Sequence, residues 1–149
     1  MIFEAVASGG CRSYFIGCEE TCAAALIDPE LSQIDRYIAL AARDGLRIRY
    51  LIDTHTHADH FSASQQLARQ LGVPVVMHRA SSAPFVDLRL QGGELLIVGR
   101  LRLQALHTPG HTHDSSRRTN TRDALTRASV RSWPRTRDCK SATVAPSSR

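Results

Sequence analysis

Residues 54–60 read Thr54-His55-Thr56-His57-Ala58-Asp59-His60, which places three imidazoles and one carboxylate within six consecutive positions. Neutral imidazole and carboxylate are side chains that suit Zn, Fe and Mn as ligands. A helix would spread these side chains around its axis, and a strand would send Asp59 and His60 to opposite faces. The stretch is therefore predicted to be an irregular loop that supplies ligands to a metal site.

A second histidine-rich stretch lies further along the chain and reads His107-Thr108-Pro109-Gly110-His111-Thr112-His113-Asp114. Each stretch directly follows a segment with the alternating pattern of a strand, residues 46–53 and residues 101–106. Since ligands in layered α/β folds gather where strands end, we expect the two stretches to meet at one site. The predicted metal ligands are His55, His57, Asp59, His60 and His111.

The rest of the first 115 residues has the pattern of an α/β domain. Alternating or short apolar runs predict strands at residues 2–7, 11–17, 22–27, 46–53, 73–77, 94–98 and 101–106. Helical spacing predicts helices at residues 31–44 and 62–71, the first with Ile34, Ile38 and Ala41 on its apolar face. Gly45 and Gly72 are the predicted helix ends, and Gly99-Arg100 is the predicted turn of a hairpin.

The pattern His55-x-His57-x-Asp59-His60 resembles the metal-binding signature of the metallo-β-lactamase superfamily, and residues 107–112 resemble its next ligand motif. Asp28, at the end of residues 23–28, fits the aspartate that ends an early strand in that family. Residues 53–62 look most like the persulfide dioxygenase branch and are also similar to the hydroxyacylglutathione hydrolases. The resemblance covers residues 1–115 and implies the first half of an αββα sandwich, with one sheet face left uncovered.

The resemblance implies two metal arrangements. In the favoured one, a single Fe(II) is held by His55, His111 and a later aspartate, with His57, Asp59 and His60 around them. In the other, two Zn(II) ions are bound, the first by His55, His57 and His111, and Asp59 and His60 begin the second site. Asp59 is also the predicted catalytic residue. Both arrangements imply a small glutathione-derived substrate.

Charge divides the chain near Ser115. Residues 1–115 hold ten Arg, no Lys and twelve Asp or Glu, a net charge of −2, whereas residues 116–149 hold eight Arg, one Lys and two Asp, a net charge of +7. The tail contains three residues of the Leu, Ile, Val and Phe class and eleven Ser or Thr. It has too little apolar surface to offset the entropy of ordering, so we expect residues 116–149 to be an unstructured basic segment.

The basic tail has two interpretations. It is either an arm that binds nucleic acid, or a segment translated out of frame from near Ser115. Its single aromatic residue, Trp133, and its scattered arginines make nucleic-acid binding the less favoured interpretation. The abrupt loss of the family pattern at one point favours the out-of-frame interpretation.

We therefore expect a truncated and inactive enzyme of the persulfide dioxygenase type, because the family's later Gly-Asp ligand motif has no match. Asp123 lacks the preceding glycine and is not assigned that role. The alternatives are a dinuclear thioester hydrolase of the hydroxyacylglutathione hydrolase type and a non-catalytic fold with a nucleic-acid-binding tail. No apolar run reaches membrane-spanning length and the N-terminal residues do not resemble a secretory signal, so a cytoplasmic location is expected. The sequence does not define the oligomeric state.

Overall fold

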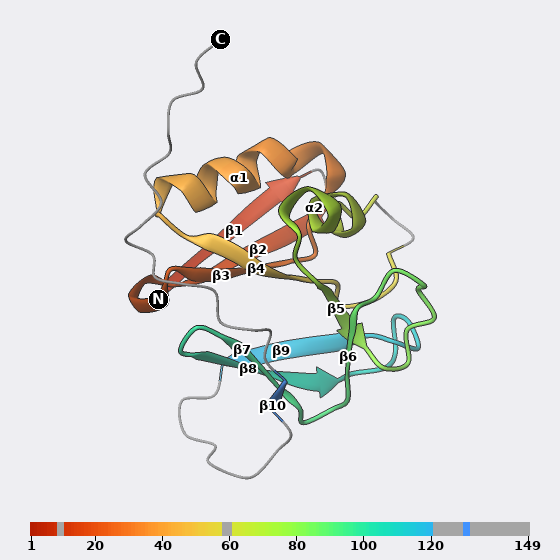
Figure 1. Ribbon diagram of the computed structural model, residues 1–149. Helices are drawn as coiled ribbons and strands as arrows, with labels where there is room; N and C mark the ends of the chain where they lie inside the picture. Colours follow the sequence, from red (N-terminus) through yellow and green to blue (C-terminus); the bar gives the residue numbers. More distant parts are fainter. Residues whose placement is uncertain (9–10, 58–60, 121–129, 132–149) are drawn as a thin grey trace.

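Three layers make up the part of the chain that the computed structural model describes, residues 1–8, 11–57, 61–120 and 130–131 (Figure 1). Helices α1 and α2 cover one face of a six-stranded sheet, and a four-stranded sheet packs on its other face. Within these residues no helix has the length and apolarity needed to cross a membrane.

The six-stranded sheet follows the order of the chain, β1 to β6. Strands β1, β2 and β3 are antiparallel neighbours, whereas β3, β4, β5 and β6 pair in parallel. Parallel neighbours need a crossover connection, and α1 and α2 supply the crossovers on either side of β4. The strand bounds are Ile2–Ser8, Cys11–Cys18, Ala23–Ile27, Arg47–Ile52, Val75–His78 and Leu88–Leu90, with a 3-10 turn, η1, at Glu19–Thr21.

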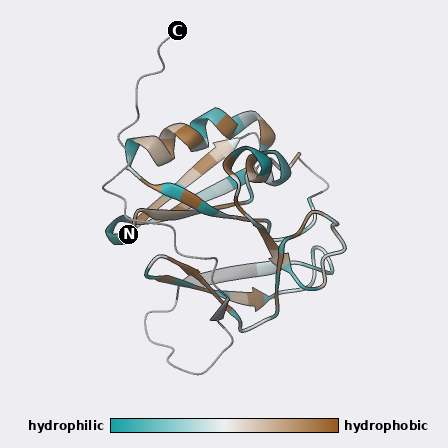
Figure 2. Ribbon diagram, viewed as in Figure 1, coloured by the Kyte–Doolittle hydropathy of each residue, from teal (hydrophilic) through white to brown (hydrophobic). Residues whose placement is uncertain are grey.

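Helix α1 spans Ile34–Arg43 after a 3-10 turn, η2, at Leu31–Gln33, and α2 spans Ser64–Leu71. Figure 2 shows hydrophilic and hydrophobic residues interleaved along α1, as expected of a helix with one buried face. That face carries Tyr37, Leu40 and Ala41, so the predicted face is confirmed at Ala41, whereas Ile34 and Ile38 are only partly buried. The Tyr37 side chain lies at the centre of the buried face of α1. The Tyr37 hydroxyl is 2.6 Å from the Ser13 hydroxyl and accepts a hydrogen bond from the Glu30 N–H at 3.0 Å, and these contacts hold it there.

The four-stranded sheet has the order β10-β7-β8-β9, with bounds Val130–Arg131, Leu95–Val98, Leu101–His107 and Ser116–Asn120. The predicted hairpin of β7 and β8 is confirmed, and Gly99 has φ +63° at its turn. A β-carbon on Gly99 would overlap the hydroxyl of Thr21, so the turn also requires glycine for space.

Apolar side chains from the two sheets form one buried cluster between them. Its members include Ile16, Ala25, Ile52 and Val76 from the first sheet and Leu96, Val98, Leu103 and Ala105 from the second. Both faces of the six-stranded sheet are therefore covered, so the expectation of an uncovered sheet face applies only to the outer face of the four-stranded sheet. The hairpin of β7 and β8, which lies within the first 115 residues, supplies the second sheet that packs against the six-stranded sheet.

The expectation of an unstructured chain from residue 116 is wrong for Ser116–Asn120, which forms β9 and pairs antiparallel with β8 from Leu103 to His107. This stretch lacks an apolar pattern because an edge strand is held by backbone pairing with its neighbour, which side chains do not encode. Residues 121–129 and 132–149 lie outside the described part of the chain. The division into a domain and a tail stays a prediction for them.

Candidate metal centre

The first histidine-rich loop begins where β4 ends, beside the ends of its two neighbours in the sheet. The Asp28 N–H, just after β3, donates to the Ile52 carbonyl at 2.8 Å, and the Asp53 N–H donates to the Val76 carbonyl at 3.0 Å. These bonds fix the backbone on both sides of the point where the chain leaves β4. The loop thus starts from a rigid position on the carboxyl edge of the parallel strands.

Asp28 organises this edge through its side chain. Its backbone has φ +48°, a left-handed conformation that aspartate tolerates better than most residues. Its Oδ1 accepts the Thr54 N–H at 2.7 Å and lies 3.1 Å from the His57 Nε2, and its Oδ2 accepts the Thr54 hydroxyl at 2.8 Å. One carboxylate therefore orients both the start of the loop and an imidazole within it.

These contacts define the proton positions on two histidines. Because a carboxylate oxygen accepts, His57 donates through Nε2–H, and the neutral imidazole then keeps its lone pair on Nδ1. The Thr54 hydroxyl donates to Asp28, so at 2.9 Å it accepts from His55 Nδ1–H, which leaves the lone pair of His55 on Nε2. A carboxylate behind an imidazole in this way fixes the tautomer and orientation of a metal-binding histidine.

The structure brings three predicted site histidines together. The ring centroids of His55 and His57 are 4.2 Å apart, and those of His55 and His111 are 5.2 Å apart with an edge-to-face arrangement. The expected meeting of the two loops is thus observed for these residues, and their role as ligands stays a prediction. Asp59 and His60, also predicted ligands, lie outside the described residues.

The sequence reasoning missed the contribution of Asp114, which joins the two loops and is 6% exposed. Its Oδ2 accepts the N–H and the hydroxyl of Thr56 at 3.1 and 2.6 Å, and its Oδ1 accepts the Thr112 hydroxyl at 2.8 Å. Burial by itself raises the pKa of Asp114, but the hydrogen bonds from these two threonines outweigh it and lower the pKa to about 2. The carboxylate is therefore charged at neutral pH.

Asp53 is the second acidic residue that the sequence reasoning left without a role. It is buried and accepts hydrogen bonds from the hydroxyls of Ser64 at 2.6 Å and Ser62 at 3.2 Å, which attaches the end of β4 to the start of α2. Burial raises the pKa of Asp53 to about 6, the hydrogen bond from Ser64 acts against the rise, and the neighbouring charge of Asp28 adds to it. Its strand-terminal position was visible in the sequence, but its serine partners were not.

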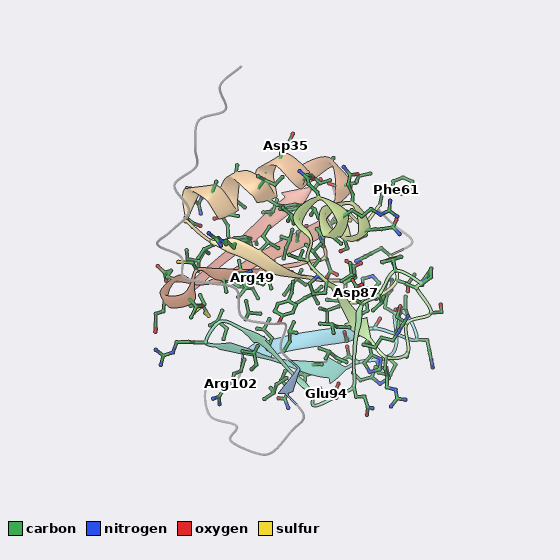
Figure 3. The ribbon with its side chains drawn as sticks, viewed as in Figure 1. Asp35, Arg49, Phe61, Asp87, Glu94 and Arg102 are labelled. Carbon is green, nitrogen blue, oxygen red and sulfur yellow. The ribbon has the colours of Figure 1, made fainter. Side chains whose placement is uncertain are left out.

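Other residues complete the surroundings of the loops. Phe61, at the end of the first loop, is 82% exposed, and Figure 3 shows it at the margin of the molecule. His78, at the end of β5, is buried and stacks on His107, with ring centroids 4.0 Å apart and planes 8° apart. His78 is therefore part of the packing at this edge, and no pattern in the sequence predicts its stacking on His107.

The residues present fit a divalent metal ion. One ligand-type atom from each of Asp28, His55 and His57 lies within 4.8 Å of the others. Both oxygens of Asp28 already accept hydrogen bonds, so we assign it to orienting the imidazoles. The lone pairs on His55 Nε2 and His57 Nδ1, with His111 beside them, form a donor set that suits Zn or Fe.

An α/β/β layered fold with a histidine and aspartate cluster where its parallel strands end defines a class of metal-binding proteins. The chain belongs to the metallo-β-lactamase superfamily, whose family model matches residues 8–121. The match includes both histidine-rich loops and extends through β9.

Two of the similar proteins carry the names of different activities. The chain is 39% identical over 101 residues to the human mitochondrial persulfide dioxygenase ETHE1, an alignment that covers 67% of this chain and 39% of the relative. It is 40% identical over 93 residues to the hydroxyacylglutathione hydrolase of Anaeromyxobacter dehalogenans, covering 62% of this chain and 36% of the relative. The chain thus spans roughly two fifths of the length of these relatives.

Solved structures agree with this assignment. The crystal structure of ETHE1 from Myxococcus xanthus superposes with a TM-score of 0.77 at 37% identity, covering 80% of this chain and 54% of the other. A metallo-β-lactamase from Staphylococcus aureus superposes with a TM-score of 0.74 at 30% identity, covering 80% and 37%. The three-layer arrangement is therefore the metallo-β-lactamase fold over most of the chain.

Proposed function

We propose that this chain is the metal-binding part of a persulfide dioxygenase that acts on glutathione persulfide. The observation that carries the proposal is the hydrogen-bonded path from Asp28 through Thr54 to His55, with His111 facing the same ring. It presents two histidines as the start of a 2-His-1-carboxylate site, the arrangement typical of non-haem iron oxygenases. The similarity to the human persulfide dioxygenase supports the choice of substrate.

Bound Fe(II) would supply open coordination positions for oxygen chemistry beside the substrate sulfur. The residues of this chain do the positioning. Asp28 holds the protons of both imidazoles on the side away from the site, so that neither ring donates into it. Asp114 keeps the loop of His111 against the loop of His55. Asp59 and His60 belong to the proposed site by their motif and lie outside the described residues.

We propose that the 149-residue chain by itself has little turnover. In the proposed iron site the third protein ligand is an aspartate of a later motif that has no match in this sequence. Loss of an outer-shell partner costs roughly 10–100-fold in metal affinity or activity, and we expect the loss of a direct ligand to cost more.

The competing function is thioester hydrolysis with two Zn(II) ions, as in hydroxyacylglutathione hydrolases. The observation in its favour is that the ring centroids of His57 and His55 are 4.2 Å apart and that His57 keeps its lone pair on Nδ1. This geometry suits a site in which His55, His57 and His111 share one metal. The relative from Anaeromyxobacter dehalogenans is as similar as the dioxygenase.

Metal preference and turnover distinguish the two functions. The chain is purified metal-free, loaded with Fe(II) or Zn(II), and assayed for oxygen uptake with glutathione persulfide and for hydrolysis of a glutathione thioester. The proposal predicts 1:1 iron binding, abolished by His55→Ala, with weak oxygen uptake and no thioester hydrolysis. Binding of two zinc ions together with thioester hydrolysis would establish the competing function instead.

A further inference from the structure

The two histidine loops are joined by side chains at one point. Thr56 stands between His55 and His57, and both its N–H and its hydroxyl donate to Asp114. The other oxygen of Asp114 accepts from Thr112, the residue directly after His111. A single buried carboxylate therefore touches a neighbour of every described site histidine, although it touches none of the rings in these contacts.

We propose that Asp114 is a positioning residue that sets the separation of His55 and His111 and so determines how tightly the site binds its metal. The inference rests on the proposed metal site and adds to it a residue that the ligand motifs do not contain. Hydrogen bonds to a charged acceptor are stronger than neutral ones. Asp114 accepts two of them from Thr56 across the gap between the loops and a third from Thr112 within its own loop.

The geometry explains why this contact controls the position of His111. Its loop is an exposed turn between β8 and β9, and the His111 ring is held by no strand or helix. Backbone hydrogen bonds fix the base of the turn: the Thr108 N–H donates to the Ser115 carbonyl at 3.0 Å, and the Ser116 N–H donates to the Thr54 carbonyl at 2.8 Å. Nearer the imidazoles, the hydrogen bonds of Asp114 to Thr56 link the two loops beside the contact between the His55 and His111 rings.

The test measures Zn²⁺ affinity by competition with a chromophoric chelator, with folding of each variant checked by circular dichroism. Asp114→Ala is expected to weaken binding by about 10–100-fold, the usual effect of removing an outer-shell partner. Thr56→Val removes one of the three bonds at an exposed, nearly isosteric position and is expected to weaken binding less. Because both changes act on one contact, Thr56→Val should add little in the Asp114→Ala background.

Asp87→Ala is the matched control. Asp87 also fixes backbone, accepting the Val75 N–H at 2.8 Å, but it does so at the start of β5, away from the end of that strand that faces the site. Its replacement should leave Zn²⁺ affinity unchanged. If Asp114→Ala does not fold, Thr56→Val alone decides the question.

A second measurement needs no metal. The rings of His55 and His111 are close enough to give a nuclear Overhauser effect between their protons, which should be present in the metal-free unaltered chain and lost in Asp114→Ala. Retention of both this signal and full Zn²⁺ affinity in Asp114→Ala would overturn the inference. Failure of the unaltered chain to bind Zn²⁺ or Fe²⁺ would overturn the proposed function, and the ring-to-ring signal would still decide the role of Asp114.

Discussion

The hydrogen bonds of Asp28 predict a specific outcome for Asp28→Asn. The Thr54 N–H can only donate, and His57 approaches the same oxygen, so the amide oxygen of asparagine should take the place of Oδ1. The amide NH₂ then faces the Thr54 hydroxyl, which must accept from it. The hydroxyl proton no longer goes to residue 28 and becomes available to His55 Nδ1, so we expect this bond to move the His55 proton to Nε2. The variant therefore presents an N–H where the metal needs a lone pair.

The magnitude follows from the bonds that are lost when metal binds to this variant. Restoring the His55 lone pair on Nε2 breaks the new bond from Thr54 to His55, worth about 0.5–1.5 kcal/mol, and leaves the Thr54 hydroxyl proton without this acceptor. Weaker orientation of His57 by a neutral acceptor adds to this cost. The sum agrees with the roughly 10–100-fold loss typical of outer-shell changes, or about 1.4–2.7 kcal/mol of binding free energy.

Two measurements check this reasoning. Chelator competition gives the Zn²⁺ affinity, and long-range ¹H–¹⁵N spectra of the metal-free protein report which nitrogen of His55 carries the proton. Asp87→Asn serves as the control for loss of a carboxylate elsewhere. An unchanged His55 tautomer together with unchanged affinity in Asp28→Asn would refute the proton path from Asp28 through Thr54.

Three further predictions concern stability. Leu103→Ala, in the cluster between the sheets, should lower the free energy of unfolding by about 2–5 kcal/mol in urea titration, whereas Leu106→Ala on the same strand should change it by less than about 0.5 kcal/mol; equal effects would contradict the described burial. Gly99→Ala should lower the free energy of unfolding more than Gly93→Ala. Both glycines have positive φ, which costs an alanine about 1–2 kcal/mol, but only at Gly99 would the added β-carbon also overlap a neighbouring side chain. The lowered pKa of Asp114 means that its charge stabilises the fold above about pH 4 and that this contribution is lost as the pH falls toward 2. Asp114→Asn should therefore make the free energy of unfolding depend less on pH in that range. An unaltered pH dependence would argue against the described hydrogen bonds.

The local patterns predicted most of the first sheet and both helices. Alternation from residue 46 to residue 53 placed β4 correctly, and Gly72 at φ +65° ends α2 as expected. Helical spacing placed Ala41 on the buried face of α1 but missed Tyr37, whose hydroxyl forms hydrogen bonds with Ser13 and Glu30. Strand β6 was missed because three residues are too few to show a period.

The site was predictable to the extent that its chemistry is local. The pattern His55-x-His57-x-Asp59-His60 predicts a metal-binding loop, and the end of a strand predicts where that loop lies. The role of Asp114 was not predictable, because its partner Thr56 is separated from it by 58 positions and nothing in either stretch marks the pair. Asp28 was recognised by resemblance, but its control of imidazole protons appears only when the three hydrogen bonds are seen together.

Strand β9 has a consequence for how this protein can diverge. The Ser116 N–H donates to the Thr54 carbonyl, and β9 pairs with β8 through its backbone. Main-chain hydrogen bonds therefore make much of the contact between β9 and its neighbours beside the two histidine loops. Backbone bonding tolerates any residue except proline at the donating positions. We therefore expect the residues of β9 after Ser116 to vary among relatives while the backbone pairing with β8 is kept. Family members that differ most after the second histidine loop are expected to retain the same pairing there.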